Sequence, residues 1–144
     1  MHEIFIETEE QRAILETVRR FVEAEVTPRS AELDANTDPE ASYSWEIVEK
    51  AHEVGLRQAT LSEEYGGMGL DSLTTSMVIE ELGKGDLGVS VIFAQTLKIA
   101  RIMESALNEE QRSRVLPKFA EDPRGMLGIG ITEPDNASNY FIPH

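Results

Sequence analysis

The sequence predicts a mainly α-helical bundle that ends in the first strand of a β domain. Two observations predict this fold class. Five segments combine helix-capping residues with apolar residues at helical spacing, and beyond residue 123 the pattern changes to a short apolar run interrupted by glycines. A length of 144 residues corresponds to one domain of ordinary size. We therefore expect a helical domain over residues 1–123 and the incomplete start of a β domain over residues 124–144.

The first helix is predicted to begin after Thr8. Thr8 and Gln11 have the spacing of a capping box, in which each side chain bonds the backbone of the other residue. Apolar residues then recur at helical spacing between Ile14 and Val26. Because Pro28 cannot donate a backbone hydrogen bond, we expect the helix to end there.

A second amphipathic helix is predicted between Ser44 and Gly55, after a polar stretch. Serine is a favoured cap at the start of a helix, and glycine is a favoured residue just after its end. Helical spacing places four residues on the side of this helix that should be buried: Trp45, Val48, Ala51 and Val54.

A glycine-rich loop and a third helix follow. The stretch EEYGGMGLDS holds Gly66, Gly67 and Gly69, which suit positive φ angles or the close approach of two chain segments. No lysine follows these glycines, so we interpret the stretch as a structural turn and not as a phosphate-binding loop. Asp71 or Ser72 caps the next helix. Its buried stripe should contain Leu73, Met77, Val78 and Leu82.

Two more helices complete the predicted bundle. The segment LGVSVIFAQTLKIARIMESAL is apolar almost all round as far as Gln95, which is typical of a central helix surrounded by neighbours. Asn108 caps the last helix, where two glutamates favour the positive end of the helix dipole. Pro117 should kink or shorten this helix.

The predicted strand begins at Gly125 with GMLGIGIT, which is too short and too rich in glycine for a helix. A single strand leaves its backbone donors and acceptors unpaired. No other segment of the sequence is a good partner for it. We therefore expect that the rest of the β domain lies in missing sequence or on a second polypeptide.

The composition excludes several classes of function. The formal net charge of −14 argues against binding to nucleic acid or to an anionic membrane, because both require concentrated lysine and arginine. The absence of cysteine excludes disulfides, thiolate metal sites and a cysteine nucleophile. The start of the chain lacks the features of a signal peptide, and no apolar run approaches the length of a membrane helix. We expect a soluble, cytoplasmic protein.

Histidines and paired acids give no sign of a metal site or an acid–base pair. His2, His52 and His144 are scattered without metal-ligand spacing, so we predict no metal. The pairs Glu63–Glu64 and Glu80–Glu81 are interpreted as solvated helix or loop faces.

Three stretches occur in a characteristic order: LSEEYGGMGLDSL, VIEELGKGD and LPKFAED followed by GIGITEPDNAS. Together they resemble the N-terminal half of flavin-dependent acyl-CoA dehydrogenases, and the likeness runs from Thr8 to Asn139. The resemblance implies an orthogonal helical bundle of that N-terminal type, followed by a β-barrel domain and a C-terminal four-helix domain. It also implies an oxidoreductase that holds FAD and an acyl-CoA thioester between these domains.

The resemblance assigns cofactor-binding and substrate-binding roles to individual residues. Thr132 and Ile131 match positions beside the reactive edge of the flavin, Ile129 matches a position that packs on the flavin ring, and Ser138 matches a serine near the cofactor diphosphate and the CoA chain. The acyl pocket is expected to include Gln95, Thr96, Leu97 and Ser138. The chain departs from the family pattern at Ala137, where relatives have glycine, and at Asn139, where they have aspartate.

The reaction implied by the resemblance is α,β-desaturation of an acyl-CoA. In relatives the C-terminal bundle supplies the catalytic glutamate, so we assign no catalytic residue to this chain. The implied partners are the acyl-CoA substrate, a second polypeptide or the missing C-terminal half, further copies in a homo- or hetero-oligomer, and an electron-transfer flavoprotein as acceptor. Two alternatives remain open: an acyl-CoA oxidase or flavin monooxygenase of the same fold, and a non-catalytic helical module that binds a partner.

Overall fold

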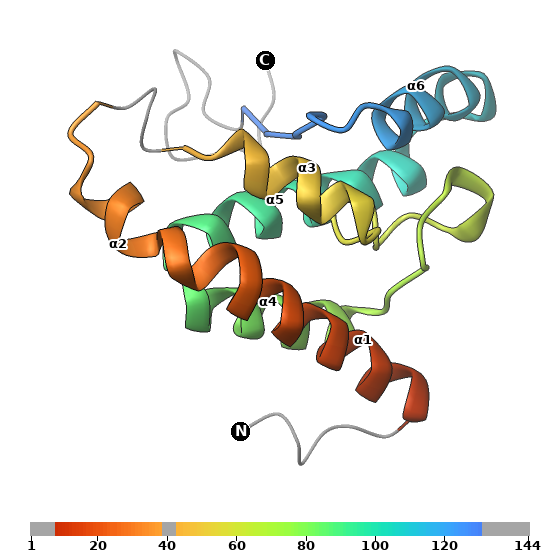
Figure 1. Ribbon diagram of the computed structural model, residues 1–144. Coiled ribbons are helices and arrows are strands. Elements are labelled where there is room, and N and C mark those ends of the chain that lie inside the picture. The colour runs from red at the N-terminus through yellow and green to blue at the C-terminus, as the bar shows by residue number, and fades with distance from the viewer. Residues whose placement is uncertain (1–7, 39–42, 131–144) are drawn as a thin grey trace, which may run out of the picture.

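The computed structural model describes residues 8–38 and 43–130, which form a helical bundle (Figure 1). The expected mainly helical fold is confirmed. The elements are α1 (Glu9–Phe21), a π-helical turn (Val22–Val26), α2 (Thr27–Ala35), α3 (Trp45–Glu53), a 3-10 turn (Glu63–Tyr65), α4 (Ser72–Gly85), α5 (Leu87–Ala106) and α6 (Glu109–Glu121). Helix α4 packs against both α1 and α5, while α6 packs against α5.

Side-chain caps begin the helices where the sequence predicts them. Thr8 and Gln11 form both bonds of a capping box, and the Gln11 amide lies 3.1 Å from Thr8 Oγ1. Ser44, Asp71 and Asn108 likewise accept a backbone N–H from the third residue of their helices. These bonds satisfy donors that a helix start would otherwise leave unpaired, so the capping residues determine where each helix begins.

The helix does not end at Pro28, and this prediction is wrong. The backbone widens into the π-helical turn Val22–Val26, in which Thr27 N–H bonds the carbonyl of Val22 five residues back. Pro28 then occupies the first turn of α2, where a missing N–H costs little. The π-helical turn therefore accommodates Pro28 without a break in the chain's helical path, which continues to Ala35. In α6, similarly, Pro117 does not shorten the helix, which continues to Glu121.

The core consists of two clusters of buried side chains. The larger one joins α1, the π-helical turn, α3, α4 and the first half of α5, and it includes Leu15, Val26, Val48, Val78 and Phe93. The smaller one lies between α5, α6 and the loop after α3. It contains Leu61, Ala100, Leu116 and Phe119. The fully buried side chains Leu15, Val26 and Val78 support the helical spacing from which the core was predicted.

Several large apolar side chains predicted to be buried are exposed. Trp45 and Val54 of the α3 region are each 43% exposed, because the buried side of α3 is formed by Ile47, Val48 and Ala51. In α4, Leu73 is 41% exposed. An exposed apolar stripe also runs along α5, so the expectation that neighbours surround this helix on all sides is wrong for the described residues. The stripe consists of Leu87, Val91 and Ile102.

The glycine-rich loop is a tight turn, as predicted. Gly66 and Gly69 have positive φ angles of 79° and 63°. A Cβ on Gly67 would lie 2.0 Å from the carbonyl oxygen of Leu61, so only glycine lets these two chain segments approach. The loop returns the chain from α3 to the start of α4 in a defined direction.

Residues 125–130 follow α6 and contain neither helix nor a strand ladder. In Figure 1 this segment, drawn in blue, runs back along the bundle from the end of α6. The remainder of the predicted strand, from residue 131, lies outside the described residues, so the domain boundary between residues 123 and 124 stays a prediction. Within the part of the chain that the structure describes, no helix combines the length and apolarity needed to cross a membrane.

Candidate functional site

The segment 125–130 leads toward the residues expected to contact a cofactor, and a buried arginine holds its start. Arg57 is fully excluded from solvent. Its Nη1 donates to the carbonyl of Gly125 at 2.7 Å, and its Nη2 donates to the carbonyl of Phe119 at 2.7 Å. The guanidinium also lies over the Phe119 ring, 4.4 Å from its centre. One side chain thus connects the end of α6 to the following segment.

The Arg57 charge is buried in a polar and aromatic environment. Burial lowers the pKa of Arg57 below its usual value, whereas the carboxylate of Asp122 opposes this shift. His52 Nδ1 lies 3.2 Å from Nη2, so this histidine contacts the arginine. The carbonyls at the end of α6 carry the negative end of the helix dipole and stabilise the cation.

Helix α5 holds the next two residues of the segment. The fully buried hydroxyl of Thr96 accepts the backbone N–H of Leu127 at 3.3 Å and donates to the sulfur of Met126 at 3.7 Å. Met126 packs against the larger core cluster, and Leu127 packs against the smaller one. The segment is therefore seated on α5 before it reaches Ile129.

The structure separates the residues predicted for the acyl pocket. Gln95 is exposed, whereas Thr96 and Leu97 are fully buried. Among the residues predicted to contact a cofactor, Ile129 is 50% exposed at the end of the anchored segment. Ile131, Thr132 and Ser138 lie outside the described residues. The described part of the site therefore contains one exposed residue from each predicted group.

A groove lies between α4 and α5. Its volume is about 400 Å³, and its lining includes Ala94, Lys98, Arg101 and Ile102. Arg101 donates to the carbonyl of Leu70 at 2.7 Å, so this cation is partly used to hold the loop before α4. The groove adjoins the exposed apolar stripe of α5 through Ile102.

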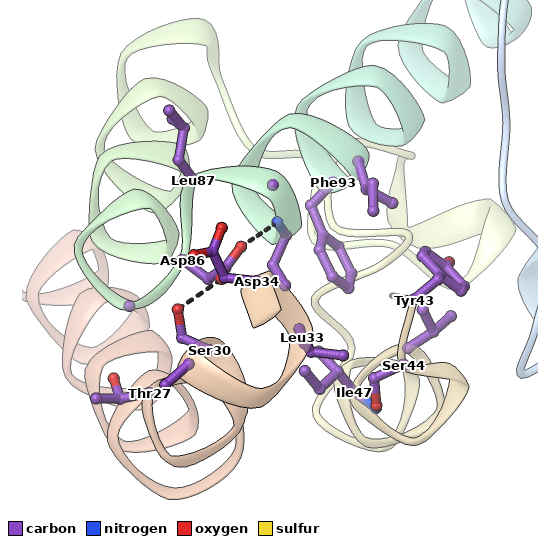
Figure 2. Close-up of a pocket in the computed structure, with 16 residues that line it drawn as sticks. Thr27, Ser30, Leu33, Asp34, Tyr43, Ser44, Ile47, Asp86, Leu87 and Phe93 are labelled. Atoms are coloured by element: carbon purple, nitrogen blue, oxygen red, sulfur yellow. Dashed lines mark hydrogen bonds between the residues drawn. The ribbon is translucent and has the colours of Figure 1, made fainter. Parts of the chain in front are cut away.

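A larger pocket of about 640 Å³ lies between α2, α3 and the start of α5 (Figure 2). Asp86 lies at one side of the pocket. Its carboxylate accepts hydrogen bonds from Ser30 Oγ at 2.6 Å and from the Val89 N–H at 2.9 Å. Tyr43 and Phe93 form part of the apolar wall. None of the described residues that line it is basic, so this lining does not suit the phosphates of a nucleotide or of CoA.

Glu81 is a buried carboxylate that the sequence interpretation placed on a solvated face, which is wrong. It is 4% exposed and accepts Arg19 Nε at 2.9 Å, while Lys84 Nζ lies 3.0 Å away. Burial raises the pKa of Glu81, but the hydrogen bonds from both cations outweigh burial and lower the pKa overall. A charged carboxylate between two cations stabilises the bundle and is unsuited to accept a proton near pH 7.

The described residues hold no group of three or more metal-ligating side chains. His52, the one histidine among the described residues, contacts Arg57. Sequence reasoning missed Arg57 because an arginine in a loop, here between Leu56 and Gln58, is ordinarily exposed and carries no local signal of burial.

Comparison with known proteins points to one family. The model of the acyl-CoA dehydrogenase N-terminal domain matches residues 8–122. A probable medium-chain specific acyl-CoA dehydrogenase of Caenorhabditis briggsae is 30% identical over 91% of this chain and 31% of its own length. A short-chain specific acyl-CoA dehydrogenase of Clostridium acetobutylicum is 34% identical over 89% of this chain and 33% of its own length. A cyclohex-1-ene-1-carbonyl-CoA dehydrogenase of Syntrophus aciditrophicus is 33% identical over 93% of this chain. The chain spans about a third of the length of these relatives.

Proposed function

The chain belongs to the acyl-CoA dehydrogenase family through its N-terminal helical domain, and from that premise we propose that it forms part of an FAD-dependent enzyme. The proposed reaction introduces a double bond between the α and β carbons of an acyl-CoA thioester. The observation that carries the proposal is the match of the family over residues 8–122, which covers every helix of the bundle. The activity belongs to the whole fold, of which this chain supplies about a third.

The described residues fit a flavin beside segment 125–130. Ile129 offers a half-exposed apolar side chain. On either side of it, a Cβ on Gly128 or Gly130 would meet no atom of the described residues within 4 Å, which leaves room for a flat ring beside the backbone. We propose that Ile129, Ile131, Thr132 and Ser138 hold FAD. When bound, FAD supplies the acceptor for the hydride that leaves the β carbon.

The substrate is proposed to lie along the exposed side of α5. Gln95 is exposed on this helix, between the apolar side chains of Val91 and Ile102. We propose that Gln95 contacts the acyl chain or thioester directly, whereas the buried residues Thr96 and Leu97 shape the pocket from beneath. Ser138 is proposed to contact the CoA chain as well. An apolar wall with a few polar groups is the usual lining of a pocket for an acyl chain.

The chemistry requires a base that removes the α proton while the hydride leaves the β carbon. None of the described carboxylates is proposed for this role, because the buried one, Glu81, is held by Arg19 and Lys84. We propose that the base comes from the part of the family fold that this chain does not match. The role of this chain is to bind, orient and shield the reactants from water.

The exposed stripe of α5 supports a partner in assembly. Leu87 is 73% exposed and Val91 is 52% exposed, and exposed apolar side chains on one side of a helix are typical of a surface that another element covers. We propose that the remaining two thirds of the fold cover it, on this or a second polypeptide. The assembled enzyme is proposed to be an oligomer in the cytoplasm that passes electrons to an electron-transfer flavoprotein.

The experiment combines the chain with a candidate polypeptide that carries the rest of the fold. We expect the purified assembly to show the visible absorption bands of bound flavin, and to lose them when butyryl-CoA or octanoyl-CoA is added without oxygen. Ile129→Asp should weaken flavin binding because it places a charge against the ring. Val54→Asp is the matched control, since Val54 is also exposed but lies at the end of α3.

Other outcomes distinguish the alternatives. Rapid reaction of the reduced flavin with oxygen would favour an acyl-CoA oxidase or flavin monooxygenase of the same fold. An assembly that forms without flavin, and in which no acyl-CoA changes the spectrum, would contradict the proposed activity and favour a non-catalytic helical module that binds a partner.

A further inference from the structure

Arg57 does more than close the end of a helix. Its Nη2 donates to the carbonyls of Phe119 and Ala120, at 2.7 and 3.1 Å, which lie in the last turn of α6. Such carbonyls have no partner within the helix, so these bonds cap it. The Nη1 branch, however, reaches beyond α6 to the carbonyl of Gly125. The guanidinium therefore joins two parts of the chain that the cap alone would not connect.

The contact between Arg57 and Gly125 is tight. A Cβ on Gly125 would lie 3.2 Å from Arg57 Nη1 and 3.2 Å from the carbonyl oxygen of Phe119. Glycine at this position lets the backbone settle directly on the guanidinium. The start of segment 125–130 is therefore held at a fixed distance from the smaller core cluster.

Thr96 provides a second anchor from a different element. Its hydroxyl contacts two successive residues, Met126 through the sulfur and Leu127 through the backbone N–H. Arg57 lies in the loop after α3, whereas Thr96 lies near the middle of α5. Two anchors on separate elements define the direction of the segment as well as its position.

We propose that Arg57 and Thr96 are positioning residues that seat residues 125–127 on the helical domain and thereby determine where Ile129 meets the flavin. The flavin half of this inference rests on the proposed function, whereas the anchoring concerns described residues alone. Residue type matters at both anchors. Lysine has the charge of Arg57 but lacks the planar fork that reaches two carbonyls at once, and valine has the shape of Thr96 but no hydroxyl.

The first experiment measures amide hydrogen exchange in the full chain. In Arg57→Lys and Thr96→Val we expect the amides of residues 125–130 to exchange about tenfold faster than in the unchanged chain, the factor expected for loss of one hydrogen bond. Amides in α1 and α4 should keep their rates. Thr96→Val is the milder variant and serves if Arg57→Lys does not fold.

Matched controls use the same residue types at sites that do not touch the segment's backbone. Arg12→Lys changes an exposed arginine that pairs with Glu9 within α1, and Thr17→Val removes a hydroxyl that bonds the carbonyl of Ala13 within α1. Neither should change exchange in residues 125–130. Unchanged exchange there in both anchor variants, or an equal rise in α1 and α4, would overturn the anchoring role.

The second experiment titrates FAD into the assembly described above. We expect the dissociation constant for FAD to rise about tenfold in each anchor variant and to stay unchanged in each control. Faster exchange with unchanged FAD affinity would overturn the positioning role, because a purely structural contact would behave in that way. If the unchanged assembly binds no FAD, the proposed function and the flavin half of this inference fail together, and the exchange experiment alone decides the anchoring.

Discussion

At the residue scale, Glu81 shows how a buried charge is tolerated in this bundle. The carboxylate lies between Arg19 of α1 and Lys84 of its own helix. Both cations reach the surface, with side-chain exposures of 34% and 50%, so removing Glu81 does not leave a buried cation. The network connects α1 to α4 by charge in addition to the apolar packing between them.

Glu81→Gln should lower the free energy of unfolding at pH 7 by about 2 kcal/mol, which is within the range for hydrogen bonds to charged groups. The pKa of Glu81 is lowered on folding from its usual 4.5, so its contribution is complete above that pH and is lost as the pH falls through the folded value. The difference from the unchanged chain should therefore shrink below pH 4.5. Urea denaturation at pH 7 and pH 3 measures it.

The exposed carboxylate of Glu16 in α1 is the matched control for this prediction. Glu16→Gln should change the unfolding free energy little at either pH. A difference between Glu81→Gln and the unchanged chain that stays constant from pH 7 to pH 3 would show that the pKa of Glu81 is not lowered in the folded state.

Gly67 is constrained by the backbone it touches. In Gly67→Ala the new Cβ would meet the Leu61 carbonyl oxygen at 2.0 Å, and a backbone atom cannot move aside as a side chain can. We expect a loss of at least about 3 kcal/mol, measured by thermal or urea unfolding. Gly128→Ala, where a Cβ meets no atom within 4 Å, should change stability little. Equal effects would contradict this account of the turn.

At the element scale, α4 contains two glycines with opposite constraints. A Cβ on Gly85 would lie 2.6 Å from Val22 Cγ1 and 3.1 Å from Val26 Cγ1, in the π-helical turn. A Cβ on Gly83 would lie 3.5 Å from Ser90 Oγ, which is ordinary contact. The end of α4 therefore approaches the π-helical turn as closely as the side chains permit.

Gly83→Ala should stabilise the protein by up to about 1 kcal/mol, because alanine favours helix over glycine. Gly85→Ala should destabilise it by about 1–3 kcal/mol through overpacking. The two variants lie in one helix, so circular dichroism during urea unfolding compares them directly. The same sign of change for both would contradict the close packing of α4 on the π-helical turn.

The starts of the helices were predictable from the sequence, whereas their paths were only partly so. A cap is a local bond between residues three apart, as between Thr8 and Gln11, and needs no knowledge of the rest of the fold. The behaviour of Pro28 depends on whether the preceding turn can widen, which packing of Val22 and Val26 decides. The exposure of Trp45 depends on which neighbours its helix meets. Such tertiary effects leave no local signal.

At the scale of the whole molecule, the exposed stripe of α5 is the surface most suited to the remainder of the fold. Val91→Glu should leave the isolated chain as stable as before, within about 0.5 kcal/mol, because Val91 is 52% exposed. It should weaken association with the polypeptide that carries the rest of the fold at least tenfold, since a charge would be buried. Analytical ultracentrifugation of the mixture measures this.

Val54→Glu is the control for the association experiment, because Val54 is 43% exposed but lies outside α5. It should leave association unchanged. Weaker association in Val54→Glu to the same degree, or none in Val91→Glu, would show that the stripe is not the docking surface.

For the candidate site, the resemblance to the family assigns roles to Ile129 and Gln95, and both side chains are exposed in the structure. Exposure alone leaves these roles as predictions. Ile131, Thr132 and Ser138 stay predictions, because they lie outside the described residues. The anchors Arg57 and Thr96 depend on contacts between residues 68 and 31 positions apart in the chain. Contacts of that kind have no pattern in a single sequence.

Trp45 is placed so that its fluorescence can report on the structure around it. Trp45 is the only tryptophan in the sequence and is 43% exposed. The guanidinium of Arg124, in the turn that precedes the anchored segment, lies 5.6 Å from its ring centre. Lifting of that turn would remove the cation from the indole and let water take its place. The fluorescence of a single side chain therefore follows the seating of the turn without any label.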